Sequence, residues 1–157
     1  MPAPPTKMTI IELPNAEWER IREHGSRDYP NECCGFLLGL QEDGRRVVRD
    51  LWAAPNLHEE TSDETRRRRY TITPADTLAA DRYAEEKGLH IVGVYHSHPD
   101  HPARPSPYDL DHAVWPWWSY IIVSIEKGRP ALLTSWALAE DRSKFEEETV
   151  EICQPKS

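Results

Sequence analysis

The sequence His90-Ile-Val-Gly-Val-Tyr-His-Ser-His98 decides the fold, and the rest of the chain can be interpreted outward from it. Residues 90–95 have the length and the β-branched content of a buried central strand. This strand ends directly on His96-Ser97-His98, and strand residues two apart point to the same face of a sheet. We therefore expect the imidazoles of His96 and His98 to point toward one place at the exit of the strand.

A helix is expected to begin shortly after the histidines, at Ser106-Pro107-Tyr108-Asp109, and to end at Pro116. Neutral imidazole is the commonest zinc ligand, and catalytic zinc sites use three protein ligands with a further position open for water. Asp109, in the first helical turn, can turn its carboxylate back toward the strand end. These residues therefore predict a zinc site of His96, His98 and Asp109.

The same helix start also has a purely structural interpretation. Ser106 at the N-cap, Pro107 at the first helical position and Asp109 at the third form a good helix start without any metal. Likewise, a histidine near a strand end is more often a surface or core residue than a metal ligand. The two interpretations do not exclude each other, because a hydroxyl that caps a helix can also face a site.

The patterns on either side predict one mixed β-sheet flanked by two or three helices, an α/β (α+β) domain in a single unit. This domain is expected over residues 8–153, with a disordered tail at 1–7 and a short tail at 154–157. Residues 56–69 are polar and without period, and are expected to form one long loop. Besides 90–95, the expected strands are 8–13, 34–40, 47–54, 70–73, 119–125, 131–139 and 150–153.

Two further helices are expected before the central strand. The first covers 15–24, with Asn15 as its cap and Gly25 just beyond its end. The second begins at Pro74 and stops at Gly88. Its inward-facing residues are expected to include Leu78, Tyr83 and Ala84.

The composition argues against several classes of protein. The chain has 157 residues and a formal net charge of −8, which fits one domain and disfavours nonspecific binding to nucleic acid. No stretch approaches the roughly 18 apolar residues of a membrane span, and residues 1–7 lack the apolar core of a signal peptide, so we expect a cytoplasmic protein. Three cysteines form no disulfide framework and are expected to be buried free thiols, namely Cys33, Cys34 and Cys153.

The joint spacing of the site residues is more specific than any one of them: His-x-His, seven residues, Ser, two residues, Asp. Chance placement of this pattern in such a chain is on the order of one in a thousand. The pattern resembles the signature of the JAMM/MPN+ zinc metalloprotease family, in its small prokaryotic stand-alone branch. The resemblance covers about residues 8–153 and implies an MPN/cytidine-deaminase-like fold. Further similar stretches are Asn31-Glu32-Cys33-Cys34-Gly35, Gly93 to Pro99, Pro105 to Pro107, and Tyr120 to Ile125.

The resemblance implies a role for each site residue. His96, His98 and Asp109 would hold one catalytic zinc ion, which lowers the pKa of its bound water and polarises the scissile carbonyl. Such a mechanism needs a carboxylate that moves the proton of the water, and the resemblance assigns this role to Glu32. Ser106 would donate its hydroxyl to the oxyanion, a contribution of about 100-fold to 1000-fold in rate.

The family hydrolyses peptide or isopeptide bonds after the C-terminal Gly-Gly of ubiquitin or ubiquitin-like proteins. The small prokaryotic branch is associated with ubiquitin-like sulfur-carrier proteins, so the expected partner is such a carrier rather than nucleic acid or a membrane. Arg66 to Arg69 are interpreted either as a contact with an acidic face of the carrier or as part of an ordinary solvated loop.

Other functions share parts of this pattern. A zinc peptidase acting on a phage-tail or cell-wall component, or a deamidating enzyme, would use the same ligand set, whereas a non-catalytic MPN scaffold would lack it. Outside the site, His101 and His112 are expected to have surface or supporting roles. The tryptophans at Trp115, Trp117 and Trp118 indicate either core packing or a partner surface, and a homo-oligomer is compatible with the second.

Overall fold

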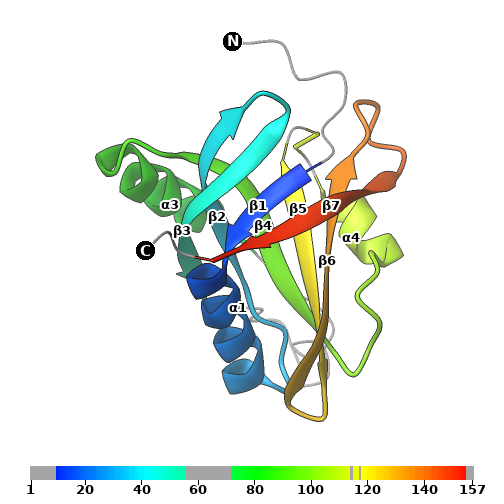
Figure 1. Ribbon diagram of the computed structural model, residues 1–157. Coiled ribbons are helices and arrows are strands. Elements are labelled where there is room, and N and C mark those ends of the chain that lie inside the picture. Colours follow the sequence, from blue (N-terminus) through cyan, green and yellow to red (C-terminus); the bar gives the residue numbers. More distant parts are fainter. Residues whose placement is uncertain (1–9, 56–71, 114, 117, 155–157) are drawn as a thin grey trace.

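The structure is a computed structural model of the chain, and it describes residues 10–55, 72–113, 115–116 and 118–154 (Figure 1). Within these ranges the strands are β1 (Ile10–Pro14), β2 (Cys34–Glu42), β3 (Arg45–Ala54), β4 (His90–Pro99), β5 (Ser119–Glu126), β6 (Arg129–Leu138) and β7 (Phe145–Cys153). The helices are α1 (Asn15–Asp28), α3 (Pro74–Glu86) and α4 (Pro107–His112).

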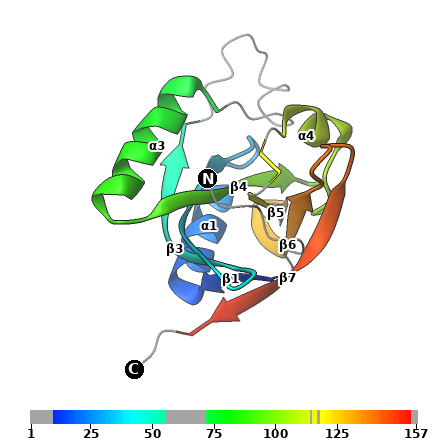
Figure 2. The ribbon, with the colours of Figure 1, turned by 90° about the horizontal axis from the view of Figure 1, so that it is seen from above.

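The strands form one mixed sheet that closes into a barrel, in the order β1-β3-β2-β4-β5-β6-β7. Strand β1 makes the closure, because it pairs in parallel with β3 on one side and with β7 on the other. Strand β4 is antiparallel to β2 and parallel to β5. Figure 2 shows β4 passing between α1 on one side and the helices α3 and α4 on the other. The prediction of a single mixed sheet with two or three helices is confirmed, and its closure is an additional feature.

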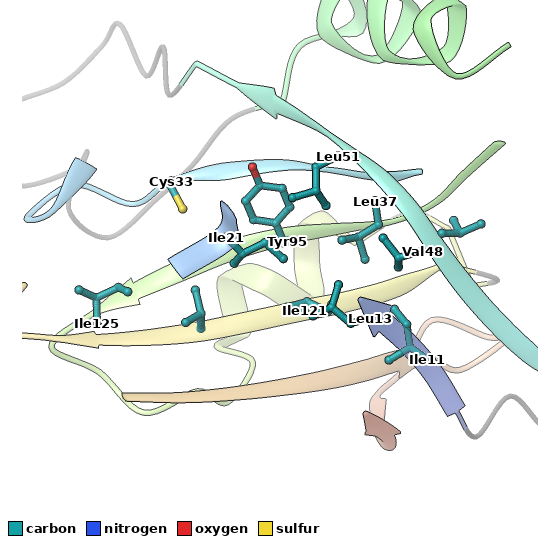
Figure 3. Packing of buried hydrophobic residues seen from close by; sticks show 12 residues of the cluster. Ile11, Leu13, Ile21, Cys33, Leu37, Val48, Leu51, Tyr95, Ile121 and Ile125 are labelled. Atoms are coloured by element: carbon teal, nitrogen blue, oxygen red, sulfur yellow. The ribbon is translucent and has the colours of Figure 1, made fainter. Parts of the chain in front are cut away.

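Two hydrophobic clusters pack on the two faces of this sheet. Successive residues of β4 alternate between them, with Val94 in one and Tyr95 in the other, so His96 and His98 project to the side of Val94. The cluster on the side of α1 includes Ile11, Leu13, Ile21, Leu37, Val48, Leu51, Tyr95, Ile121 and Ile125 (Figure 3). The cluster on the side of α3 and α4 includes Phe36, Leu38, Ala80, Ala84, Val94, Ala113, Tyr120 and Leu138.

A buried polar network joins the strands near the closure of the barrel. The guanidinium of Arg46 on β3 donates to Glu148 on β7 at 3.2 Å and to Ser119 on β5 at 3.1 Å. Ser135 on β6 donates to the same Glu148 carboxylate at 2.8 Å. A charge removed from water is tolerated when it is paired and hydrogen-bonded. The network therefore favours the closed arrangement, which brings Arg46 and Glu148 together.

Helix α1 differs from its prediction at both ends. Its N-cap is Pro14 rather than Asn15, and it continues through Gly25 to Asp28 instead of stopping at residue 24. A Cβ atom on Gly25 would lie 2.7 Å from Cδ1 of Ile125, so glycine permits the helix to pack closely on β5. The glycine that was interpreted as a helix end is therefore a packing residue.

Helix α3 begins where predicted, and its N-cap is Thr73. The predicted strand over 70–73 is wrong for residues 72 and 73, while residues 70 and 71 lie outside the described ranges. Leu78 does not face inward, because 52% of its surface is exposed. Ala84 is buried as predicted, and Tyr83 packs partly buried against the second cluster.

The hairpin of β2 and β3 and the strands β5 and β6 occur where predicted, but other boundaries shift. Strand β4 continues through Pro99, β7 begins at Phe145 rather than residue 150, and α4 ends at His112, before Pro116. The predicted tail at 1–7, the long loop at 56–69 with its arginines and most of the C-terminal tail lie outside the described residues. None of the helices in the described ranges has the length and apolar character that crossing a membrane requires.

Candidate metal centre

Three side chains from two elements converge on the face of the sheet that carries α4. Nε2 of His96 lies 3.1 Å from Nε2 of His98 and 3.2 Å from Oδ1 of Asp109. Nε2 of His98 lies 3.1 Å from Oδ2 of Asp109. All three residues are buried, and they form a group that could hold a metal ion. The structure thus brings together the three residues that the spacing predicted as ligands.

The two histidines lie inside β4 rather than after its end. His96 pairs with Cys34 of β2 and with Ile122 of β5, and His98 pairs with Ser124 of β5. Backbone pairing with the neighbouring strands therefore fixes where both imidazoles leave the main chain. Their alternation with Ser97 puts them on the same face, as the spacing of two residues predicted.

The ring of His98 has a defined tautomer. Its Nδ1 lies 2.8 Å from the carbonyl oxygen of Pro102, and a carbonyl only accepts hydrogen bonds, so Nδ1 carries the hydrogen. In the neutral ring, Nε2 then presents a lone pair toward Asp109 and His96. An Nδ1–H held by a backbone carbonyl is the usual support of a metal-binding histidine.

This set of donors fits a zinc ion. A lone pair that faces a carboxylate and a second imidazole is repelled unless a cation or a proton lies between them. Imidazole nitrogens and a carboxylate oxygen are also the ligand types of catalytic zinc, and ligand atoms about 2.0–2.1 Å from a tetrahedral ion would lie about 3.3 Å apart. The separations of 3.1 and 3.2 Å are close to this value.

Burial and neighbouring groups set the ionisation of the ligands. Burial lowers the pKa of His96, which favours the neutral ring that a metal ion needs. Burial alone would raise the pKa of Asp109, but the adjacent His96 and His98 and the hydrogen bond donated by the Ser106 N–H hold this pKa well below its usual range. Asp109 therefore provides a carboxylate rather than a carboxylic acid.

Ser106 is the N-cap of α4 and forms a capping box with Asp109. The Asp109 N–H donates to Ser106 Oγ at 3.1 Å, and the Ser106 N–H donates to Asp109 Oδ2 at 2.8 Å. The structural interpretation of this helix start is therefore confirmed. The same box also adjoins the metal centre, because Oδ2 of Asp109 contacts His98 as well.

Glu32 is buried just before β2, with 3% of its surface exposed. The next residue, Cys33, donates its backbone N–H to Ser97 Oγ at 2.8 Å, and its carbonyl accepts the Ser97 N–H at 3.1 Å. Ser97 lies between the two histidines, and Glu32 immediately precedes Cys33, which is hydrogen-bonded to Ser97. The structure excludes the alternative that Glu32 is an ordinary exposed acid.

Ser97 is a residue that the sequence analysis missed, although its place between His96 and His98 marked it. It faces the side of α1, where a Cβ atom on Gly25 would lie 3.7 Å from its own Cβ. Its side chain and backbone connect the segment of Glu32 to the strand of the ligands. Ser97 thus supports the site from the face opposite to His96 and His98.

Other polar and aromatic residues lie outside the ligand group. His101 and His112 are exposed, which fits the expected surface positions. Trp115 is 48% exposed and stacks on Trp118, whose ring packs against the second hydrophobic cluster, while Trp117 lies outside the described residues. Cys33 and Cys34 are buried free thiols as predicted, and Cys153 is partly exposed.

A cavity of about 1070 Å³ opens beside the centre. Its lining includes residues 100–104 and Thr134 of β6, whose hydroxyl donates to the carbonyl of Ala103 at 2.6 Å. The segment that borders the cavity also supports the metal centre, because the Pro102 carbonyl accepts from His98. His96, His98 and Asp109 do not line this cavity themselves, and Pro102 connects it to His98.

Comparison with protein families identifies a match over most of the chain. The model described as prokaryotic homologs of the JAB domain matches residues 14–139. The chain belongs to this family. The matched range contains all the predicted site residues, so the family predicted from their spacing is confirmed.

Two relatives with names are similar over about two thirds of the chain. A protein of Thermus thermophilus named "Probable TtuB-protein conjugate cleaving protease" is 33% identical over 106 residues, which cover 68% of this chain and 65% of that protein. The desampylase of Haloferax volcanii is 34% identical over 103 residues, which cover 66% of this chain and 69% of that protein. The chain thus spans slightly less than two thirds of the length of the Thermus relative.

A solved structure extends the similarity to nearly the whole chain. The solution structure of a protein from Salinibacter ruber has 48% sequence identity and a TM-score of 0.69. It covers 92% of this chain and 94% of the Salinibacter chain. The mixed α/β fold is therefore shared beyond the residues that the family model matches.

Proposed function

We propose that this protein is a zinc-dependent peptidase or isopeptidase that hydrolyses the bond after the C-terminal Gly-Gly of a ubiquitin-like or sulfur-carrier protein. The observation that carries the proposal is the convergence of His96, His98 and Asp109 on one point, with their donor atoms 3.1 to 3.2 Å apart. Relatives in the JAB family that are named as conjugate-cleaving enzymes support the choice of substrate.

His96, His98 and Asp109 would hold the zinc ion, and zinc bound in this way lowers the pKa of a bound water and polarises a carbonyl. The protein supplies the orientation of these ligands. The Pro102 carbonyl fixes the ring of His98, and the Ser106 N–H fixes the carboxylate of Asp109.

Two further residues handle the proton and the developing charge. Glu32 takes the proton of the attacking water and delivers it to the departing amine, since a carboxylate outside the ligand set is needed for this transfer. Ser106 Oγ accepts the N–H of Asp109, and a hydroxyl that accepts one hydrogen bond still carries its own hydrogen. Ser106 donates this hydrogen to the oxyanion of the tetrahedral intermediate.

The proposal also covers the extent of the domain, its location and its partner. One catalytic domain over residues 8–153, located in the cytoplasm and able to self-associate, recognises its carrier by protein contact. The formal net charge of −8 supports a protein partner rather than nucleic acid, because it disfavours nonspecific contact with phosphates. Arg66 to Arg69, which lie outside the described residues, would meet an acidic face of the carrier.

The test is hydrolysis of a carrier protein that ends in Gly-Gly followed by a short extension. The zinc-loaded protein should release the extension, a chelator should stop the reaction, and added zinc should restore it. Glu32→Gln should keep zinc and fold but lose hydrolysis. Glu19→Gln is the matched control, because Glu19 is exposed on α1 and pairs there with Arg22 at 2.7 Å.

Three outcomes would contradict separate parts of the proposal. Retained turnover of Glu32→Gln would remove Glu32 as the base. A zinc-loaded protein that leaves every Gly-Gly carrier intact would remove the substrate class and favour a different peptide substrate. A purified protein unable to take up zinc would refute the enzyme as a whole.

A further inference from the structure

The segment that carries Glu32 is attached at one end to β4, which carries the two histidines, and at the other end to Asp100, the residue that follows β4. On its C-terminal side, Cys33 exchanges two hydrogen bonds with Ser97, one to Oγ at 2.8 Å and one from the Ser97 N–H at 3.1 Å. On its N-terminal side, the hydroxyl of Tyr29 donates to Oδ2 of Asp100. Glu32 lies between these two attachments, which end on residues 97 and 100, next to the ligand His98.

Asp100 connects more than two segments. Its Oδ1 accepts the backbone N–H of Lys127 in the turn between β5 and β6 at 2.8 Å, and its own N–H donates to the Ile125 carbonyl at 2.7 Å. Asp100 and Lys127 both have a left-handed backbone, with φ of 56° and 50°. The carboxylate therefore sits at a tight junction of β4 and the β5–β6 turn, and it presents its second oxygen to Tyr29.

Tyr29 is held by more than its hydroxyl. Its N–H donates to the Gly25 carbonyl at the end of α1 at 3.1 Å. A Cβ atom on Gly128, in the β5–β6 turn, would lie 3.7 Å from Cδ1 of the tyrosine ring, which is ordinary contact distance. A change from tyrosine to phenylalanine therefore removes the hydrogen bond to Asp100 and keeps the aromatic ring.

We propose that the hydrogen bond from Tyr29 to Asp100 positions Glu32 for proton transfer. Asp100 is held by the β5–β6 turn, and Tyr29 connects the segment of Glu32 to it. This rests on the proposed function, in which Glu32 is the base. Residues 29–33 lie between the end of α1 and the start of β2, and inside this segment the Asn31 N–H donates to the Asp28 carbonyl at 2.8 Å. The Tyr29 attachment therefore adds a second fixed point, besides the one at Cys33 and Ser97, between the segment of Glu32 and residues 97–100.

The consequence for the reaction follows from geometry. A base must lie within hydrogen-bond reach of the proton that it removes. A displacement of about 1 Å can cost about 100-fold in rate. Tyr29 and Asp100 touch neither the ligands nor the reacting atoms in this scheme, so they act through Glu32 and should change kcat rather than KM or zinc binding.

The test compares Tyr29→Phe with Tyr83→Phe in the zinc-loaded protein. Tyr83 is the matched control, because its hydroxyl also donates to an aspartate, Asp50, at 2.8 Å, but it joins α3 to β3. We expect Tyr29→Phe to lower kcat by about 10-fold to 100-fold, with KM, zinc content and melting temperature as in Tyr83→Phe. Amide hydrogen exchange of residues 31–33 should be faster in Tyr29→Phe alone.

Variants of Asp100 provide the second arm. Asp100→Ala removes both acceptors and should reproduce the loss in kcat. Asp100→Asn should restore most of kcat, because its carbonyl can accept the Lys127 N–H while its amide donates to the Tyr29 hydroxyl.

The outcomes separate this proposal from the proposed function. A wild-type kcat in Tyr29→Phe would overturn the positioning role, and so would a loss of kcat that is accompanied by loss of zinc or by no change in exchange at 31–33. Full turnover of Glu32→Gln would instead refute the assignment of Glu32 as the base, whatever the result for Tyr29.

Discussion

Helices α3 and α4 start with the same local pattern, a hydroxyl residue, a proline, a variable residue and an aspartate. In α3, the Thr73 N–H donates to Asp76 at 3.2 Å and the Asp76 N–H donates to Thr73 at 3.1 Å. In α4, the Ser106 N–H donates to Asp109 at 2.8 Å and the Asp109 N–H donates to Ser106 at 3.1 Å. As helix starts, the two capping boxes are equivalent.

The two aspartates differ in what lies opposite them. Asp76 is partly exposed, whereas Asp109 is buried and each of its oxygens contacts a histidine of β4. Helix α4 has only 6 residues, against 13 in α3, and an isolated helix of that length is not stable. The position of Asp109 therefore depends on the sheet below it. A capping box becomes part of a metal centre only where another element supplies the remaining ligands.

The largest difference is expected when each aspartate is replaced by asparagine, which keeps an acceptor for the cap but removes the charge. Asp109→Asn should lower zinc affinity by more than about 100-fold, because loss of an outer partner alone costs about 10-fold to 100-fold. Hydrolysis should fall to the background rate. Asp76→Asn should retain both zinc and hydrolysis. Metal content after dialysis against a chelator of known affinity measures the effect, and equal loss of zinc in both variants would contradict it.

A smaller difference is expected for the two hydroxyls. Ser106→Ala should lower kcat by about 100-fold to 1000-fold at unchanged zinc content, because the oxyanion loses a donor. Thr73→Ala should leave kcat unchanged, since Asp76 is outside the ligand group. Steady-state kinetics of both zinc-loaded variants on the same carrier fusion provide the comparison. Wild-type kcat in Ser106→Ala would leave this residue only its role as a cap.

The three residues of the candidate metal centre were predictable because they lie close together in the sequence. The alternation of a strand puts His96 and His98 on one face, and the helix start places Asp109 in a first turn. Glu32 has no such local signal. It lies far from the histidines in the chain, and the pairing of β2 with β4 brings its segment beside them, so only the family resemblance pointed to it.

The positions of the strands were more predictable than their closure or the packing between elements. Strand patterns depend on local sequence, but the barrel closes through parallel pairing of β1 with β7 and through Arg46 and Glu148, which are distant in the chain. The role of Gly25 likewise depends on a residue that is distant in the chain. A glycine can end a helix or permit close packing, and only the neighbouring Ile125 distinguishes the two.

The smallest difference is expected in stability, where the two boxes should act alike. Loss of an N-cap hydroxyl costs about 1 kcal/mol, so Thr73→Ala and Ser106→Ala should each lower the free energy of unfolding by about that amount. Urea unfolding of the zinc-free proteins gives both values, since bound metal would add its binding free energy to that of folding. If Ser106→Ala has no cost while Thr73→Ala has the expected one, α4 is frayed without metal. The box of α4 would then form only together with the metal centre, whereas the box of α3 would be independent of it.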